Sequence, residues 1–218
     1  MKLVVWDIDG TLVDSHAMIM ESMAAGMAAA GLPALPAARV SGIVGLSLPV
    51  AVQTLLPDRD AAARAAVVDG YRRHYFSARS RAESPLFPGA RACLDRLAAR
   101  GDLLMAVATG KSRRGLDALL AAHGLTRYFV ATHCADGHPS KPAPGMILSC
   151  LSDSGTDADR AVMIGDTSFD IRMAGNAGIA AFGVAWGHHP AEDLIRAGAL
   201  AVARDFTELA TMIEEWAA

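Results

Sequence analysis

Two aspartates near the start of the chain stand one residue apart, directly after an apolar run. Residues 3–6 are Leu, Val, Val and Trp, and residues 7–11 read DIDGT. A carboxylate at the end of a buried strand is costly to desolvate, so it needs a strong reason to be there, and a metal or a transferring phosphate supplies one. Alternation along an extended strand places Asp7 and Asp9 on the same side, and Gly10 lets the backbone turn beneath them. The pattern predicts acid–base or phosphoryl-transfer chemistry here; the alternative is an ordinary Asp-Gly turn with capping acids.

Polar residues also follow two later apolar runs. Thr109 and Gly110 directly follow one run, and Asp166 follows another, with Asp170 four residues later. Lys141 lies in the proline-rich sequence SKPAP, a stiff entry to a helix. Taken singly, these residues have plain structural interpretations: a capping threonine, an acidic turn, a solvated lysine. Open α/β sheets nevertheless bind ligands at the carboxyl ends of their strands, so we expect all of them at one rim.

The elements that must position these residues follow from the hydrophobic pattern. Residues 15–81 read as helices, with Ser15, Ser47 and Asp58 as candidate N-caps. From residue 87 onward, expected helices alternate with expected strands. The helices are at 90–100, 112–123, 144–151 and 168–177, and further helices follow at the end of the chain. The strands are at 103–108, 128–131, 161–164 and 180–185. Such alternation predicts an α/β fold with a doubly wound, mostly parallel sheet. We therefore expect a core domain of residues 1–14 and 85–218 and an inserted all-helical domain of residues 15–84.

The composition of the chain restricts the classes of molecule that it is expected to bind. The chain has 218 residues, 52% of them hydrophobic, a net charge of −3 and a pI near 6.1. This balance offers no electrostatic footprint for nucleic acid or an anionic membrane, so a small molecule is the expected partner. The three cysteines form no paired framework, and no apolar run resembles a signal peptide or a membrane span. These features predict a soluble, cytoplasmic protein, either a monomer or a homodimer.

The ordered set of motifs closely resembles the haloacid dehalogenase superfamily of phosphohydrolases. The set comprises DxDGT, a Thr-Gly after a strand, a Lys-Pro and the GDxxxD of residues 165–170. Residues 186–206 are similar to the phosphoglycolate phosphatase-like branch, and the early helical block resembles that branch's cap. The loop at residues 42–47, with a glycine near each end, would close over the site and exclude water.

The resemblance implies a role for each motif residue. Asp7 would be the nucleophile that forms an aspartyl-phosphate, and Asp9 the acid and base that holds a proton when Asp7 does not. Mg²⁺ would be held by Asp7, Asp166 and the backbone carbonyl of Asp9, with Asp170 supporting it directly or through water. The residues expected to hold phosphate oxygens are Gly10, Thr11, Thr109, Gly110 and Lys141. Lys111 is expected to face solvent.

Departures from other branches favour hydrolysis of a small phosphomonoester of the phosphoglycolate or sugar-phosphate type. Dehalogenases lack the second aspartate of the first motif, and the Schiff-base phosphonate hydrolases need a cap lysine. The lysines here are Lys2, Lys111 and Lys141, none of them in the cap. A sugar-phosphate mutase must grip a second phosphate, yet residues 40–58 contain no lysine or arginine. Such a mutase remains the alternative within the superfamily, and a phospho-receiver-like module or a catalytically silent protein the alternative outside it.

Two further groups carry open interpretations. Arginines 72, 73, 79 and 81 stand near the end of the cap, where one could bind a substrate carboxylate; a solvated basic face is the alternative. His133, Cys134 and His138 could be zinc ligands, although their irregular spacing disfavours a structural site.

Overall fold

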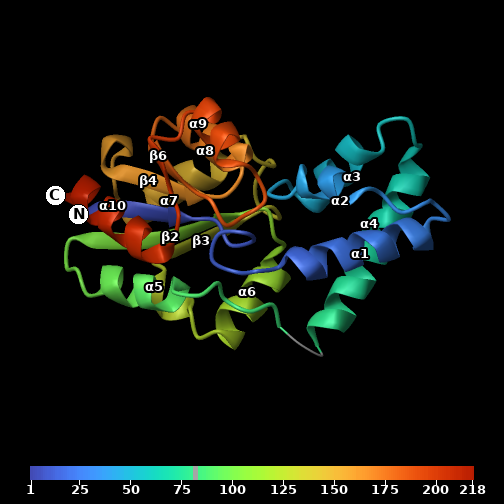
Figure 1. Ribbon diagram of the computed structural model, residues 1–218, viewed down its shortest axis with the longest axis horizontal. Helices are drawn as coiled ribbons and strands as arrows, with labels where there is room; N and C mark the ends of the chain where they lie inside the picture. Colours follow the sequence, from blue (N-terminus) through green and yellow to red (C-terminus); the bar gives the residue numbers. More distant parts are fainter. Residues whose placement is uncertain (81–82) are drawn as a thin grey trace.

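The computed structural model describes residues 1–80 and 83–218 and has a six-stranded, all-parallel sheet at its centre (Figure 1). The strand order is β3-β2-β1-β4-β5-β6. The strands are β1 (Lys2–Trp6), β2 (Leu103–Thr109), β3 (Ala131–Cys134), β4 (Ala161–Gly165), β5 (Ala180–Val184) and β6 (Ala201–Ala203). The expected α/β fold with a doubly wound parallel sheet is confirmed.

Helices cover both faces of the sheet, which explains why its strands are nearly continuous apolar runs. Val4 and Trp6 of β1 pack in the apolar cluster beneath one face, whereas Leu3 and Val5 pack in the cluster beneath the other. The first cluster is completed by α5 (Ala90–Ala98), α6 (Arg113–Ala122) and α10 (Phe206–Ala217). The second is completed by α7 (Gly145–Ser154), α8 (Ser168–Asn176) and α9 (Ala191–Ala197).

The register of the sheet brings three strand ends together. Trp6, the last residue of β1, lies opposite Val107 of β2 and Ile164 of β4. The chain leaves β1 at Asp7, whose N–H donates a hydrogen bond to the carbonyl of Ile164 at 3.0 Å. The polar residues that follow β1, β2 and β4 therefore meet at one rim of the sheet.

Four helices between β1 and α5 form a separate body beside that rim (Figure 1). We call residues 15–80 the insertion; its helices are α1 (His16–Ala29), α2 (Ala37–Ser41), α3 (Leu48–Leu55) and α4 (Ala61–Arg79). They share an apolar cluster of their own. Helices α1 and α4 approach closely because Gly26 and Gly70 meet at their crossing, where a Cβ on Gly70 would lie 2.9 Å from Gly26 Cα. Both chain termini lie at the opposite end of the sheet (Figure 1).

The structure corrects several local expectations. The strand expected at 128–131 is β3, three residues later, and Tyr128 belongs to a 3-10 turn, Thr126–Tyr128. The tail contains a strand, β6, besides its helices. Asp60, not Asp58, caps α4, while Ser15 and Ser47 precede helices without a side-chain capping bond. The expected boundaries of the two domains stay a prediction.

Helices long and apolar enough to span a bilayer are absent from the described residues. Cys93, Cys134 and Cys150 are buried free thiols.

Candidate active site

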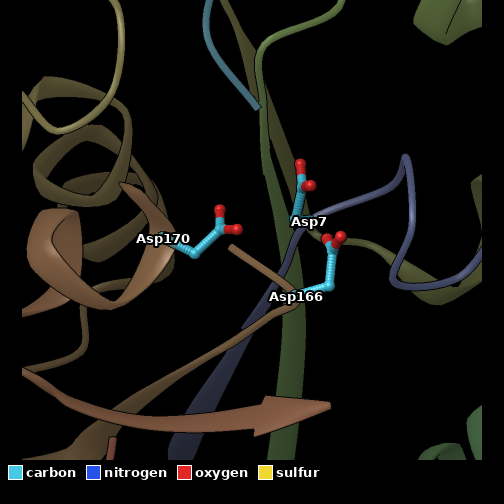
Figure 2. A group of neighbouring side chains, drawn as sticks. All are labelled: Asp7, Asp166 and Asp170. Carbon is cyan, nitrogen blue, oxygen red and sulfur yellow. The ribbon is translucent and has the colours of Figure 1, made fainter. Parts of the chain in front are cut away.

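Three buried carboxylates converge at the rim. Asp7 follows β1, Asp166 follows β4, and Asp170 lies in the first turn of α8. One oxygen from each lies within 4.8 Å of the others, and the side chains point toward a common space (Figure 2). Since like charges repel strongly when desolvated, this cluster requires cationic compensation.

Lys141 supplies part of that compensation. Its side chain is fully buried, with Nζ 2.7 Å from Asp7 Oδ1 and 2.6 Å from Asp170 Oδ1. Asp170 is held in place because its Oδ2 accepts hydrogen bonds from the N–H and hydroxyl of Thr167, forming a capping box at the start of α8. A helix start thus fixes one carboxylate of the cluster, which in turn orients the lysine.

Asp7 has the character of a cation ligand. Its contact with Lys141 is an ion pair, and neither of its buried oxygens accepts a hydrogen bond within the described part of the chain. Burial, reinforced by Asp170 and Asp166 and opposed by Lys141, raises the pKa of Asp7 to about 7. A set of carboxylate oxygens fits Mg²⁺, which would favour the ionised form of Asp7.

Asp166 is held by groups from two distant segments. Its Oδ1 accepts a hydrogen bond from the Thr11 hydroxyl at 2.9 Å, and its Oδ2 contacts the N–H and Nδ1 of His188 at 2.9 and 2.8 Å. Gly10 and Gly187 flank the carboxylate so closely that a Cβ on either would collide with it. Sequence reasoning missed His188; the only signal was two adjacent histidines in the tail segment WGHHP.

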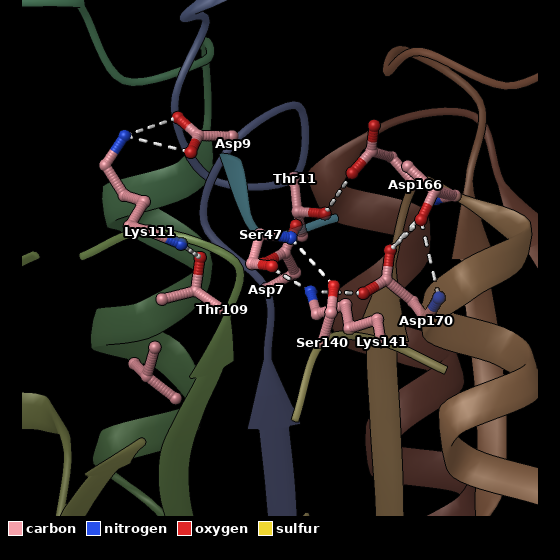
Figure 3. A network of polar contacts seen from close by, with 12 residues as sticks. Asp7, Asp9, Thr11, Ser47, Thr109, Lys111, Ser140, Lys141, Asp166 and Asp170 are labelled. Atoms are coloured by element: carbon pink, nitrogen blue, oxygen red, sulfur yellow. Dashed lines mark hydrogen bonds and ion pairs between the residues drawn. The ribbon is translucent and has the colours of Figure 1, made fainter. Parts of the chain in front are cut away.

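Lys111 corrects an expectation, because it is buried rather than solvent-facing. Its Nζ contacts both carboxylate oxygens of Asp9, at 2.7 and 2.9 Å (Figure 3). It also contacts the Tyr75 hydroxyl at 2.9 Å. Although burial acts against the charged form, Lys111 holds the pKa of Asp9 below its usual value. Without a cation or phosphate, Asp7 therefore binds a proton more readily than Asp9; the expected proton on Asp9 in the metal-bound site stays a prediction.

The residues expected to bind phosphate lie at the same rim, but their present contacts differ. The Thr109 side chain is buried beside Lys111, with its Oγ1 3.4 Å from the Lys111 N–H. The Gly10 N–H donates to the Val13 carbonyl, and the Thr11 N–H donates to the Ile8 carbonyl. Both amides thus serve the turn after β1. Their role toward phosphate stays a prediction.

Gly110 contacts the insertion. A Cβ at this position would lie 2.6 Å from the Gly45 carbonyl oxygen, and Gly45 itself has a φ of +98°. The Ser47 N–H also donates to Ser140 Oγ at 2.8 Å. The loop at residues 42–47 is therefore seated on the rim of the sheet, as expected for a segment that closes the site.

A cavity of about 220 Å³ lies between the insertion and the rim. Asp7, Asp9, Thr109, Gly110 and Lys111 line it from the rim, and side chains from α1, α3, α4 and the 42–47 loop line it from the insertion. The cavity therefore opens directly onto the first aspartate pair.

Among the cap arginines, Arg72 lines the cavity. Arg79 instead donates to the Gly115 carbonyl and pairs with Glu83, and Arg81 lies outside the described residues.

Within the described residues, His133, Cys134 and His138 do not form a possible zinc site. His133 contacts His138 at 3.1 Å and Asp153 at 2.9 Å, both through nitrogens of its own ring, and the described residues hold no potential metal group that includes Cys134.

Comparisons with known proteins agree on one family. Residues 4–184 match the model of the family described as "Haloacid dehalogenase-like hydrolase". The chain is 36% identical to the "Probable phosphatase IndB" of Dickeya dadantii, over 95% of this chain and 91% of that protein. It is 34% identical to a "Phosphoglycolate phosphatase" of Agrobacterium fabrum, over 85% and 81% of the two chains. A crystal structure of a predicted phosphatase from Clostridium acetobutylicum superposes with a TM-score of 0.88 at 27% identity, covering 98% of each chain.

Proposed function

Because the chain belongs to the haloacid dehalogenase-like hydrolase family, we propose that it is a Mg²⁺-dependent phosphatase that hydrolyses a small phosphomonoester through an aspartyl-phosphate. The observation that carries this proposal is the position of Asp7. It stands at the end of the central strand beside two further carboxylates, with one buried oxygen paired to Lys141 and the other without a hydrogen-bond partner in the described residues, and it faces the cavity.

The proposed reaction has two halves. In the first, an Asp7 oxygen attacks phosphorus, the bond from phosphorus to the alcohol oxygen breaks, and that oxygen takes a proton from Asp9. In the second, water attacks the phosphorus of the aspartyl-phosphate, Asp9 takes one proton from that water, and phosphate leaves Asp7 in its original form. Lys141 would neutralise charge developing on the phosphoryl oxygens.

The metal is proposed to bind among Asp7, Asp166 and Asp170, with the Asp9 backbone carbonyl as the ligand that the family resemblance adds. When bound, Mg²⁺ would polarise the phosphoryl group and offset the repulsion between an anionic ester and Asp7. The dianionic phosphate would in turn raise the pKa of neighbouring Asp9, because like charges disfavour ionisation. Substrate binding thereby supports a proton on Asp9 against the influence of Lys111.

Hydrolysis is favoured over the mutase alternative by the charges around the cavity. Among the described residues that line it, the cations are Arg72 and Lys111, and Lys111 is already paired with Asp9. Arg72 is proposed to bind a carboxylate on the substrate, such as that of phosphoglycolate, the substrate named for relatives 28–34% identical. The described residues that line the cavity offer no cluster of cations that could bind a second phosphate.

The test is phosphate release from phosphoglycolate and a panel of metabolite monophosphates, with Mg²⁺ and with a chelator. We expect repeated turnover that chelation abolishes reversibly, and loss of turnover in Asp7→Asn. Asp14→Asn is the matched control, since Asp14 is an exposed aspartate close by in the chain. Wild-type-like turnover by Asp7→Asn would overturn the nucleophile assignment, and a single phosphorylation without release would favour the receiver-like alternative.

The buried free cysteines support a reducing compartment, so we also propose a cytoplasmic location. Sedimentation velocity distinguishes the proposed monomer from the homodimer.

A further inference from the structure

The cavity above Asp7 and Asp9 has an apolar roof. Side chains from three insertion helices and the 42–47 loop form it: Ile19, Met23, Ile43, Val44, Leu48 and Phe76. Ile43 and Val44 are only 7% and 5% exposed and belong to the apolar cluster of the insertion, so their positions are fixed by packing. The surface that an alcohol group would meet is thus preformed and hydrocarbon-rich.

The polar side chains around the cavity are mostly engaged already. Lys111 is held by Asp9 and Tyr75. The Ser112 hydroxyl caps the start of α6, and Asp136 accepts a backbone N–H at 2.7 Å. Each of these groups keeps some hydrogen-bonding capacity, but the existing contact holds its side chain in one orientation, so it can meet a ligand from few directions.

Three lining side chains have no hydrogen-bond or ion-pair partner within residues 1–80 and 83–218. They are the hydroxyls of Ser47 and Tyr71 and the exposed guanidinium of Arg72. The hydroxyl groups of a polyhydroxylated sugar that face the roof would meet hydrocarbon side chains. A hydroxyl that leaves water without a new partner opposes binding, whereas a hydrocarbon group in the same place is favoured.

The 42–47 loop strengthens this discrimination between hydroxyl and hydrocarbon groups, because it contacts the rim of the sheet beside the cavity. The Gly45 carbonyl packs against Gly110, and the Ser47 N–H bonds to Ser140. The cavity, about 220 Å³, is smaller than the roughly 300–1,000 Å³ of pockets for drug-sized ligands. A small alcohol therefore contacts the roof over much of its surface.

We infer that the alcohol part of the substrate, apart from a carboxylate that Arg72 would bind, is apolar over the surface that faces the roof, as in a small cycloalkyl or aryl phosphate, rather than a polyhydroxylated sugar. This inference rests on the proposed phosphatase function and specifies its substrate class. The selecting surface is the apolar roof, centred on Val44 and Leu48.

The test compares two esters that differ mainly in hydroxyl groups. Cyclohexylmethyl phosphate and glucose 6-phosphate are both primary alkyl phosphates on a six-membered ring, so their leaving groups have similar intrinsic reactivity. We expect kcat/KM with Mg²⁺ to be at least about tenfold higher for cyclohexylmethyl phosphate. Phosphoglycolate and the metabolite panel serve as independent checks that the enzyme is active.

Variants locate the preference at the roof. Leu48→Asn, which is nearly isosteric, should reduce the ratio of the two kcat/KM values about tenfold, and Val44→Thr should reduce it in the same direction. Val50→Asn is the matched control: Val50 belongs to the same helix but is 39% exposed and does not line the cavity. Its ratio should equal that of the wild type. Thermal melting checks that each variant is folded.

Each outcome decides one question. Equal or faster hydrolysis of glucose 6-phosphate overturns the inference, as does turnover of phosphoglycolate with neither member of the pair accepted. A ratio unchanged in both folded roof variants also overturns it. Absence of phosphate release from every ester, with Mg²⁺ present, contradicts the proposed phosphatase function instead.

Discussion

At the scale of single residues, the site is an unbalanced group of buried charges. Asp7, Asp166 and Asp170 face Lys141, and all four side chains are buried. Although burial disfavours its charged form, the carboxylates of Asp170 and Asp7 keep the pKa of Lys141 above its usual value. One ammonium does not neutralise three carboxylates, and the excess negative charge is what a divalent cation would compensate.

The raised pKa of Asp7 gives a pH dependence of stability that can be measured on metal-free protein. The pKa is about 7 when folded against a reference value of 3.8, so the folded state binds more protons between these values. Stability therefore falls as pH rises through this window. In chemical denaturation at pH 4.5–7.5, a range that lies around the two cited pKa values, we expect Asp7→Asn to flatten the decline relative to wild type.

Mg²⁺ should flatten the same decline in the wild type, since a bound cation favours ionised Asp7. Asp14→Asn should follow the wild-type curve. Identical pH profiles for Asp7→Asn and wild type would show that Asp7 does not carry this proton.

Residue types and order revealed the carboxylates and Lys141, but the environment of Lys111 could not be predicted from the sequence. In the sequence TGK, the lysine follows a strand end and resembles any solvated loop residue. Its burial arises from Tyr75, which is distant in the chain and belongs to the insertion. Because this contact joins residues that are far apart in the chain, no local sequence pattern predicts it.

At the scale of elements, a pair of glycines allows the 42–47 loop to lie on the sheet. Gly110 follows β2, and its missing side chain leaves room for the Gly45 carbonyl. Gly45 adopts a φ of +98°, which L side chains rarely tolerate. The closeness of this contact makes it sensitive to one methyl group.

Gly110→Ala should therefore impair closure more than folding. The new Cβ would lie 2.6 Å from a backbone oxygen, so the loop must shift away from the rim. We expect kcat/KM to fall by on the order of tenfold or more, as for small misplacements in active sites, with a melting temperature close to that of wild type. Steady-state kinetics and thermal melting measure the two effects.

Gly101→Ala is the matched control, because a Cβ there meets no atom within 4 Å. Equal kinetics for the two alanine variants would contradict the role given to this contact.

The long apolar runs made most strands predictable, while short elements escaped. β6 has only three residues and two of them are half-buried, so it carries no clear alternation. The apolar residues 128–130 suggested a strand, but Tyr128 completes a 3-10 turn and the strand begins at Ala131. Pairing with β2, a tertiary effect, sets that boundary.

At the scale of the whole molecule, the cavity exists because two bodies meet, and a hydrogen-bonded chain of side chains joins them. Tyr75 of α4 stacks on Tyr71 and bonds through its hydroxyl to Lys111, which binds Asp9. The insertion thus contacts Asp9, the proposed acid and base, by way of Lys111. The positions of the motifs predicted the rim, but the relative placement of the two bodies required the structure.

Tyr75→Phe should weaken this connection while keeping the aromatic stack. A hydrogen bond to a charged group contributes about 1.5–3 kcal/mol, so we expect KM to rise by at least about tenfold, with a smaller change in kcat. Tyr128→Phe is the control, since its hydroxyl bonds to Asp95, away from the cavity. A larger loss in kcat than in KM would instead assign Tyr75 a role in the chemical step.

The chain enters and leaves the insertion at adjacent points. The Asp14 N–H donates to the Pro85 carbonyl at 2.9 Å, and Val13 forms a bridge with Leu86. Replacement of the helices between these points would leave the strands and the carboxylate cluster untouched. A laboratory graft of other helices at the same two junctions could therefore redirect this scaffold to new esters, if the graft restores a partner for Lys111 and a loop that fits against Gly110.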